Sequence, residues 1–254
     1  MGASDSGRHD TDQGGEGATL NFGRFWACRH DCVTLFIDRK ISYNLAAPVA
    51  YGSARARLTP NQVSLASGVT AFVAFLLGIS LPPDQVLVPI LLIYGTSQLS
   101  YVFDCADGQL ARVTGTKSKF GDFFDKSIDI TAFTLLFGGY FAYLYRYFMA
   151  VGDSEAAARW LLLGFFFLMV RTSRFAVWQR FEAEHGAEGA ERATGDGWIV
   201  VVLKNLMDMQ VSLFGMLLFP FAPELAYALF AMQTVILAAV YARYFFRAKD
   251  LFGV

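Results

Sequence analysis

The sequence has little charge for its length. Only 17% of its 254 residues are charged and 55% are hydrophobic, whereas about 25% are charged in an ordinary soluble domain. The mean hydropathy is +0.40. The formal net charge of −1 produces no field that would attract nucleic acid, so a nucleic-acid partner is not indicated. The composition predicts a polytopic membrane protein.

Cysteine and histidine are also scarce, with three residues of each. Three cysteines are too few for a disulfide framework. Cys28, His30 and Cys32 lie close together, but no second pair of zinc ligands accompanies them, so a structural zinc site is not favoured. We interpret these residues as reduced and structural.

The first part of the chain is polar. Residues 1–20 are rich in Gly, Asp and Ser and contain no apolar run typical of a cleaved targeting segment, so we predict a disordered cytosolic tail. Residues 21–58 form the predicted juxtamembrane segment, with an amphipathic helix over roughly 31–51 that lies in the interface. Thr59 and Pro60 then predict the cap and the first position of a helix.

The rest of the chain, residues 59–248, is predicted to be one membrane domain of about six spanning helices. The expected spans are 60–81, 86–112, 119–147, 157–181, 196–219 and 223–246. Residues 182–197 are polar and rich in Gly and Ala, which predicts an exposed loop. The expected fold class is therefore an all-α polytopic membrane protein with an N-terminal amphipathic helix.

Lysine and arginine are unevenly distributed between the two sides of these spans. They collect before the first span, in the loop between the second and third, and after the fourth and sixth, whereas the opposite connections have few. By the positive-inside rule, both termini and the second-to-third loop face the cytoplasm. We expect an integral protein of a bacterial cytoplasmic membrane.

Carboxylates and small residues surround the second-to-third loop. The eight positions of this motif are Asp104, Asp107, Gly108, Ala111, Arg112, Gly121, Asp125 and Asp129. Helical spacing places the aspartates of each helix on one face. If the two helices are antiparallel neighbours, the four carboxylates meet at one depth, where divalent cations would offset the cost of burying them. Oxygen ligands without a nearby histidine favour Mg²⁺ or Mn²⁺ over Zn²⁺, and Cys105 points away from this face.

The small residues of the motif have two interpretations. Gly108, Ala111 and Gly121 either let a nucleotide lie against the helix backbones or allow close helix packing. The guanidinium of Arg112 suits a phosphate or the carboxylates. Ser118 is either a hydroxyl at the edge of a nucleotide pocket or a surface serine.

Two polar neighbours of the motif have structural explanations. Asp122 is expected to pair with Lys126 one helical turn later. Asn61, just inside the first span, either bonds a nucleotide or caps the helix end, and capping is the simpler explanation.

Four further charges lie well inside the later apolar runs. Arg171 and Arg174 are on the fourth expected span, and Lys204 and Asp208 are on the fifth. Intramembrane charges are often functional, and a cationic pocket here would favour an acceptor that carries phosphate, such as glycerol phosphate or inositol phosphate. Alternatively, Lys204 pairs with Asp208 at i,i+4 and the arginines reach out to the interface. The sequence leaves both interpretations open.

The eight motif positions match, without gap or substitution, the signature of the CDP-alcohol phosphotransferase family, and the chain resembles that family. The resemblance implies an integral membrane enzyme of phospholipid biosynthesis. Such an enzyme transfers a substituted phosphate from a CDP-alcohol to a hydroxyl acceptor and releases CMP; CDP-diacylglycerol is the donor we favour. The resemblance also implies a homodimer.

The resemblance assigns a role to each motif residue. The implied metal ligands are Asp104, Asp107 and Asp125, with Asp129 close to two Mg²⁺ or Mn²⁺ ions and acting as the general base. The expected nucleotide-binding residues are Gly108, Ala111, Arg112, Ser118 and Gly121, and the candidate acceptor-binding residues are Arg171, Arg174 and Lys204.

Two alternative functions are weighed against this one. The same chemistry with a soluble donor, such as CDP-choline, CDP-ethanolamine or CDP-inositol, would use a lipid or polyol acceptor. A cation transporter or channel would also need intramembrane aspartates, but it predicts carboxylates spread along a path through the membrane. Here they cluster beside one loop, and a channel gives the small residues of the motif no role.

Overall fold

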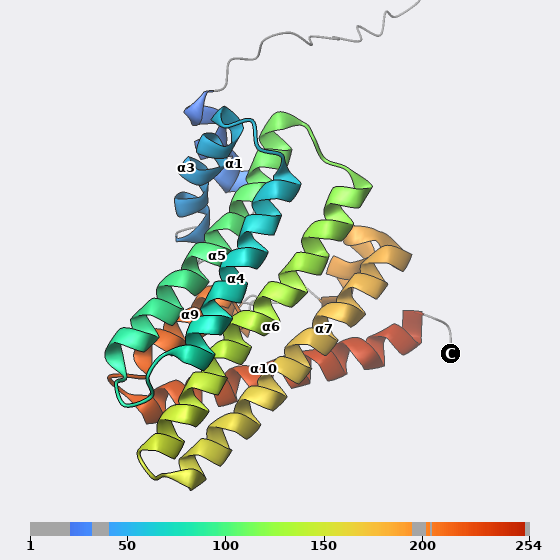
Figure 1. Ribbon diagram of the computed structural model, residues 1–254. Coiled ribbons are helices and arrows are strands. Elements are labelled where there is room, and N and C mark those ends of the chain that lie inside the picture. The colour runs from blue at the N-terminus through green and yellow to red at the C-terminus, as the bar shows by residue number, and fades with distance from the viewer. Residues whose placement is uncertain (1–20, 32–40, 195–201, 204, 252–254) are drawn as a thin grey trace, which may run out of the picture.

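The computed structural model describes residues 21–31, 41–194, 202–203 and 205–251, and these residues form helices and short connections without any strand (Figure 1). The all-α prediction is confirmed. The named helices are α1 (Phe22–Asp31), α3 (Ser42–Arg55), α4 (Pro60–Ser80), α5 (Leu87–Thr114), α6 (Lys119–Ala150), α7 (Ser154–Thr194), α9 (Met209–Leu218) and α10 (Pro223–Leu251). The predicted N-terminal tail, Cys32 and Lys204 lie outside the described residues.

Four helices are long and apolar enough to cross a bilayer, within the part of the chain that is described. They are Pro60–Ser80, Lys119–Ala150, Ser154–Arg180 and Pro223–Arg243. The protein is therefore an integral membrane protein. Helix α5 has 28 residues, about 42 Å at 1.5 Å per residue. It is long enough to span but more polar, because it carries two serines, two glutamines and two aspartates.

The predicted fifth span, 196–219, is wrong as a continuous helix. The chain turns at Met207 and Asp208, and α9 begins only at Met209. Asp208 caps α9, since its side chain accepts a hydrogen bond from the backbone N–H of Gln210 at 3.0 Å. Ten residues make about 15 Å of helix, roughly half of a bilayer core. Asp208 therefore lies before α9 and not within a continuous fifth span; its expected partner Lys204 lies outside the described residues.

The predicted loop 182–197 is also wrong over most of its length, because α7 continues to Thr194. Alanine and glutamate are frequent in this stretch, and their helix propensity outweighs that of two glycines. At the N-terminal side, α3 occupies the second half of the expected amphipathic segment and α1 precedes it.

Helix α4 packs along both α5 and α6, which contact each other much less extensively. The expected antiparallel pair α5 and α6 is therefore bridged by α4. The backbones of α4 and α6 cross closely at Gly78 and Gly139, where a Cβ on Gly139 would lie only 2.7 Å from Cα of Phe75. Small residues at a crossing allow such an approach between membrane helices.

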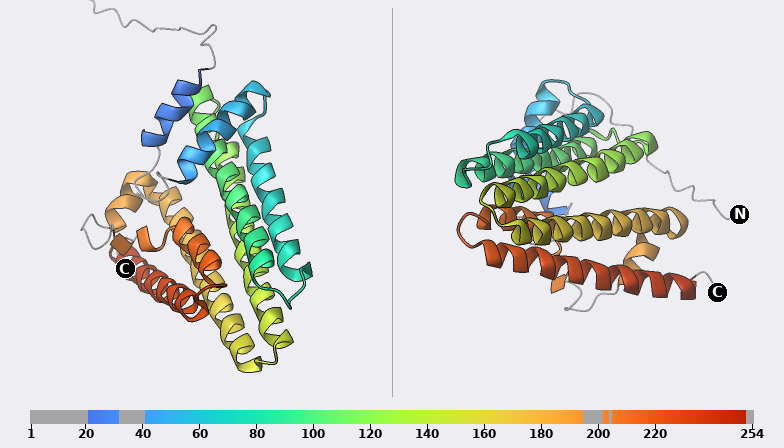
Figure 2. Two further views of the ribbon diagram at one scale, coloured as in Figure 1. Left: turned by 90° about the vertical axis from the view of Figure 1, so that its left-hand side faces the viewer. Right: turned by 60° about the horizontal axis from the view of Figure 1, so that its bottom comes forward.

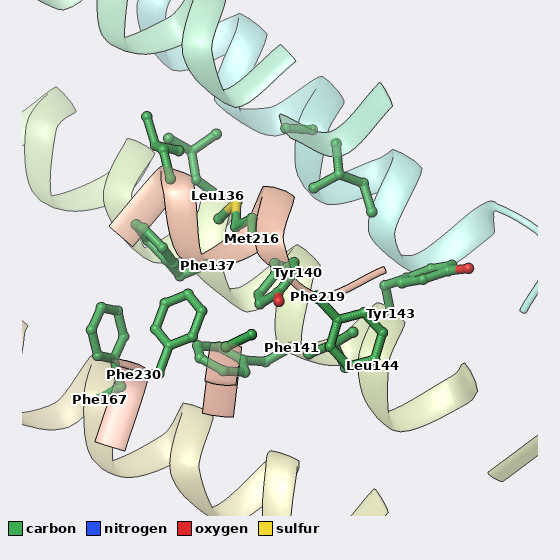
Figure 3. Packing of buried hydrophobic residues seen from close by; sticks show 14 of the residues in the cluster. Leu136, Phe137, Tyr140, Phe141, Tyr143, Leu144, Phe167, Met216, Phe219 and Phe230 are labelled. Carbon is green, nitrogen blue, oxygen red and sulfur yellow. The ribbon is translucent and has the colours of Figure 1, made fainter. Parts of the chain in front are cut away.

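A large aromatic cluster holds α6, α7 and α10 together. Figure 3 shows Phe137 and Phe141 of α6 beside Phe167 of α7 and Phe230 of α10. The rings of Phe137 and Phe167 have centroids 5.2 Å apart, and those of Phe167 and Phe230 are 5.3 Å apart. Figure 2 shows α7 between α6 and α10, in agreement with their contacts. A second cluster joins α1 and α3 to α5 at the end where the α5–α6 connection lies (Figure 1).

Candidate metal centre and active site

Three of the four aspartates converge between α5 and α6. One carboxylate oxygen from each of Asp104, Asp125 and Asp129 lies within 4.8 Å of the other two. Asp104 comes from the second half of α5, and the other two come from the first half of α6. The sequence prediction that the two halves of the motif meet is borne out for these three residues.

Asp107 occupies a different position from the other three. Its side chain is only 3% exposed. It lies within hydrogen-bonding reach of Asp125, but it is not part of the three-oxygen group. Its Oδ2 accepts a hydrogen bond of 2.5 Å from the hydroxyl of Ser64 on α4. Asp107 therefore contacts Ser64 of α4 and lies near Asp125 of α6.

The donor set fits a divalent cation. Carboxylates packed this closely repel one another, and Asp129 Oδ1 is buried without a hydrogen-bond partner among the described residues. A divalent ion bound among these carboxylates would offset both costs, and oxygen-only ligands suit Mg²⁺ or Mn²⁺. Cys105 is buried in the apolar cluster with α1 and α3, so its thiol lies apart from this group, as predicted.

Gly108 provides room for Arg112. A Cβ on Gly108 would lie 3.1 Å and 3.4 Å from the two terminal nitrogens of the Arg112 guanidinium, so this side chain folds back across the glycine. Helix α5 then ends at Gly115, whose φ of 69° is left-handed and whose N–H donates to the Ala111 carbonyl. Arg112 is one helical turn after Gly108, and its guanidinium lies against that glycine.

Gly121 lies in a confined position at the start of α6. Ser118 caps this helix, because its Oγ accepts a hydrogen bond of 2.9 Å from the backbone N–H of Gly121. A Cβ on Gly121 would lie 3.0 Å from that Oγ and 3.3 Å from Oδ1 of Asn61. Ser118 therefore has a structural role that neither expectation named, since it is the N-cap of α6.

The interpretation of Asn61 as a helix cap is wrong. Thr59 caps α4 in a reciprocal arrangement with Gln62, and Pro60 occupies the first turn, as predicted for that pair. The Asn61 side chain instead faces Gly121 across the gap between α4 and α6. Because cap and site residues are adjacent here, residue type alone could not separate them.

A pocket of about 380 Å³ opens beside Gly121, between the α3–α4 and α5–α6 connections. Its lining residues are Ala54, Arg57, Leu58, Thr59, Pro60, Asn61, Leu110, Thr114, Thr116 and Ser118. Arg57 has a left-handed φ of 58°, which is uncommon for a residue with a side chain. Sequence reasoning identified Ser118 but missed the contribution of the α3–α4 connection, since nothing in the motif extends there.

Arg171 makes contacts inside the protein. Its Nη1 donates a hydrogen bond of 2.7 Å to the Met207 carbonyl, and its guanidinium carbon lies 4.6 Å from the centroid of the Phe133 ring. These contacts join α7 to α6 and to the turn before α9. Arg171 therefore does not simply reach out to the interface. Arg174 is half-buried one turn further along α7.

The expected pair between Asp122 and Lys126 is confirmed. Lys126 Nζ lies 3.0 Å from Asp122 and 3.4 Å from Glu182 on α7. The lysine therefore links α6 to the long C-terminal part of α7, next to the Asp125 position.

Taken with the fold, this site defines an integral membrane protein with a carboxylate centre between two helices beside a short loop. The model of the CDP-alcohol phosphatidyltransferase family matches residues 57–244, which is more than half of the chain and includes every motif residue. The chain belongs to this family, and the resemblance noted from the motif is confirmed. It is a membrane transferase that moves a substituted phosphate from a CDP-alcohol in phospholipid synthesis. A search of curated proteins found no match.

Proposed function

We propose that the chain transfers the substituted phosphate of CDP-diacylglycerol to a hydroxyl acceptor and releases CMP, with two Mg²⁺ or Mn²⁺ ions in the site. The observation that carries this proposal is the convergence of Asp104, Asp125 and Asp129, whose carboxylate oxygens lie within 4.8 Å of one another. The family supplies the reaction class. The donor, the acceptor and the ions are our inference.

Asp104, Asp107 and Asp125 would hold the ions, and Asp129 would lie beside them. When bound, the ions neutralise the pyrophosphate of the donor and stabilise charge that develops on the transferred phosphate. The closeness of the carboxylates supports this assignment, because without an ion their mutual repulsion opposes the packing of α5 against α6.

Asp129 is the proposed general base. Its Oδ1 is buried and accepts no hydrogen bond from a described residue, so it has lone pairs available for a new donor. Asp129 would take the proton from the acceptor hydroxyl. The hydroxyl oxygen then bonds to the β-phosphorus, and the bond from that phosphorus to the bridging oxygen breaks, which releases CMP.

The nucleotide is expected to lie against Gly108, Ala111 and Gly121. A side chain at Gly121 would contact Ser118 and Asn61, so the site has room for a nucleotide here only while this residue is a glycine. Arg112 would contact a phosphate through its planar donors, and Ser118 would border the pocket.

The acceptor would approach from the α7 side, near Arg171, Arg174 and Lys204. Arg171 also donates to the Met207 carbonyl and lies over the Phe133 ring, which fixes its position on α7. We further propose, from the family resemblance, that the enzyme is a homodimer. The distribution of lysine and arginine supports an active site that faces the cytoplasm of a bacterial cell.

The test is CMP release by the purified full-length protein with Mg²⁺ or Mn²⁺ and CDP-diacylglycerol. The acceptor panel contains glycerol phosphate, inositol phosphate, inositol, serine and a lipid hydroxyl. We expect release with one acceptor, and none from an Asp104→Asn control. Release with CDP-choline, CDP-ethanolamine or CDP-inositol, but never with CDP-diacylglycerol, would replace our donor with a soluble one.

A further inference from the structure

We propose that Ser64 of α4 is a positioning residue for the Asp107 carboxylate and thereby raises the affinity of the site for its divalent cation. This inference rests on the proposed function, since it takes Asp107 as a metal ligand. It places part of the metal centre on α4, a helix that carries none of the eight motif residues.

The contact between the two side chains is short and buried. Ser64 and Asp107 are 2% and 3% exposed, and their oxygens are 2.5 Å apart. The Ser64 hydroxyl also lies 3.2 Å from the carbonyl oxygen of Pro60. A hydroxyl has one proton, and a hydrogen bond to a carboxylate is stronger than one to a neutral carbonyl. The proton is therefore donated mainly to Asp107.

This hydrogen bond restricts how Asp107 rotates. Its Oδ2 is held by the Ser64 hydroxyl of α4, and the carboxylate also lies within reach of Asp125 on α6. Without the hydroxyl, repulsion between the two carboxylates would favour other rotamers of Asp107 in the absence of metal. Hydrogen bonds from residues behind a ligand commonly orient it, and their loss lowers metal affinity by about 10- to 100-fold.

The backbone of α4 is well fixed at this point. Its first turn is closed by the reciprocal cap between Thr59 and Gln62, and its far end crosses α6 in close contact at Gly139. Helix α4 also touches both halves of the motif, because Ser64 contacts Asp107 of α5 while Asn61 faces the start of α6. A rigid helix is the kind of support that orients a ligand within a few tenths of an ångström.

Ser67 provides a matched control on the same helix. It is as buried as Ser64, at 2% exposed, and its hydroxyl hydrogen-bonds to the Ser100 carbonyl at 2.9 Å. Ser67→Ala removes the same group from the same interface between α4 and α5, but its partners are the carbonyl and hydroxyl of Ser100 and no carboxylate is involved.

The experiment measures Mn²⁺ binding to full-length protein in detergent after removal of metal with EDTA, with free Mn²⁺ followed by electron paramagnetic resonance. Ser64→Ala should raise the Kd for Mn²⁺ by about tenfold or more. Ser64→Thr, which keeps the hydroxyl, should bind close to wild type, and Ser67→Ala should leave the Kd unchanged. If the alanine variant does not fold, Ser64→Cys, with its weak S–H donor, takes its place with the same expectation.

The outcomes separate this inference from the proposed function. If the wild-type protein binds Mn²⁺ and the Ser64→Ala variant binds it with the same Kd, the proposed role of Ser64 is wrong but the metal centre is not contradicted. An equal rise in Kd for Ser67→Ala would show general loosening of α4 and would also overturn it. Wild-type protein that releases CMP without binding Mn²⁺ or Mg²⁺ would contradict the metal centre itself.

Discussion

At the scale of single residues, the four aspartates are not equivalent. Asp104, Asp125 and Asp129 present oxygens to one another, whereas Asp107 is turned toward Ser64 and Asp125. Their spacing in the sequence predicted convergence but could not show this difference, because it depends on a helix outside the motif. We therefore expect substitutions of different aspartates to affect different steps.

Asp129→Asn should abolish turnover and leave binding of the CDP-alcohol donor largely intact. The amide keeps the size of the side chain but cannot take the acceptor proton. Asp104→Asn should instead weaken Mn²⁺ and donor binding together. Turnover and donor binding by isothermal titration calorimetry distinguish the two variants, and near wild-type turnover of Asp129→Asn would show that this residue is not the base.

Gly121→Ala should raise the KM for the CDP-alcohol by about tenfold, which corresponds to about 1.4 kcal/mol of binding. The added Cβ would lie 3.0 Å from Ser118 Oγ and 3.3 Å from Asn61 Oδ1, so one of these side chains must move at the pocket edge. Gly138→Ala is the matched control on α6, because its Cβ meets nothing within 4 Å. Equal kinetics for both variants would remove Gly121 from the nucleotide site.

At the scale of elements, hydrophobic runs predicted α4, α5, α6, α7 and α10 but not the break before α9. Asp208 interrupts the fifth apolar run because its side chain caps the next helix, and average hydropathy does not detect a capping hydrogen bond. Likewise, α7 continues past its apolar part because helix propensity, not hydrophobicity, sets where it ends.

Gly139→Ala should destabilise the crossing of α4 and α6 by about 1–3 kcal/mol, the usual cost of overpacking a tight interface. Its Cβ would lie 2.7 Å from Cα of Phe75, and backbone atoms cannot move aside as a flexible side chain can. The measurement is Tm in detergent. The adjacent Gly138→Ala serves as control and should leave Tm unchanged or slightly raised, and a Gly139→Ala variant with the same Tm would contradict the close crossing.

At the scale of the whole molecule, the all-α membrane fold and the meeting of the motif halves could be predicted from the sequence. The position of α4 between α5 and α6 could not be predicted, because an apolar helix can pack against any neighbouring helix and its residue pattern does not specify which. For the same reason Asn61 and Ser64, which α4 brings to the site, were not identified as site residues. The motif predicted where the aspartates lie, and the packing of α4 adds Asn61 and Ser64 to the site.

The most direct test of the account is CMP release from CDP-diacylglycerol by metal-stripped wild-type protein, before and after Mn²⁺ is restored, with the acceptor panel present. We predict no release without metal, recovery when Mn²⁺ is added, and no recovery in Asp104→Asn. Full release by stripped wild-type protein, or equal recovery in the Asp104→Asn variant, would contradict a metal centre built on these aspartates.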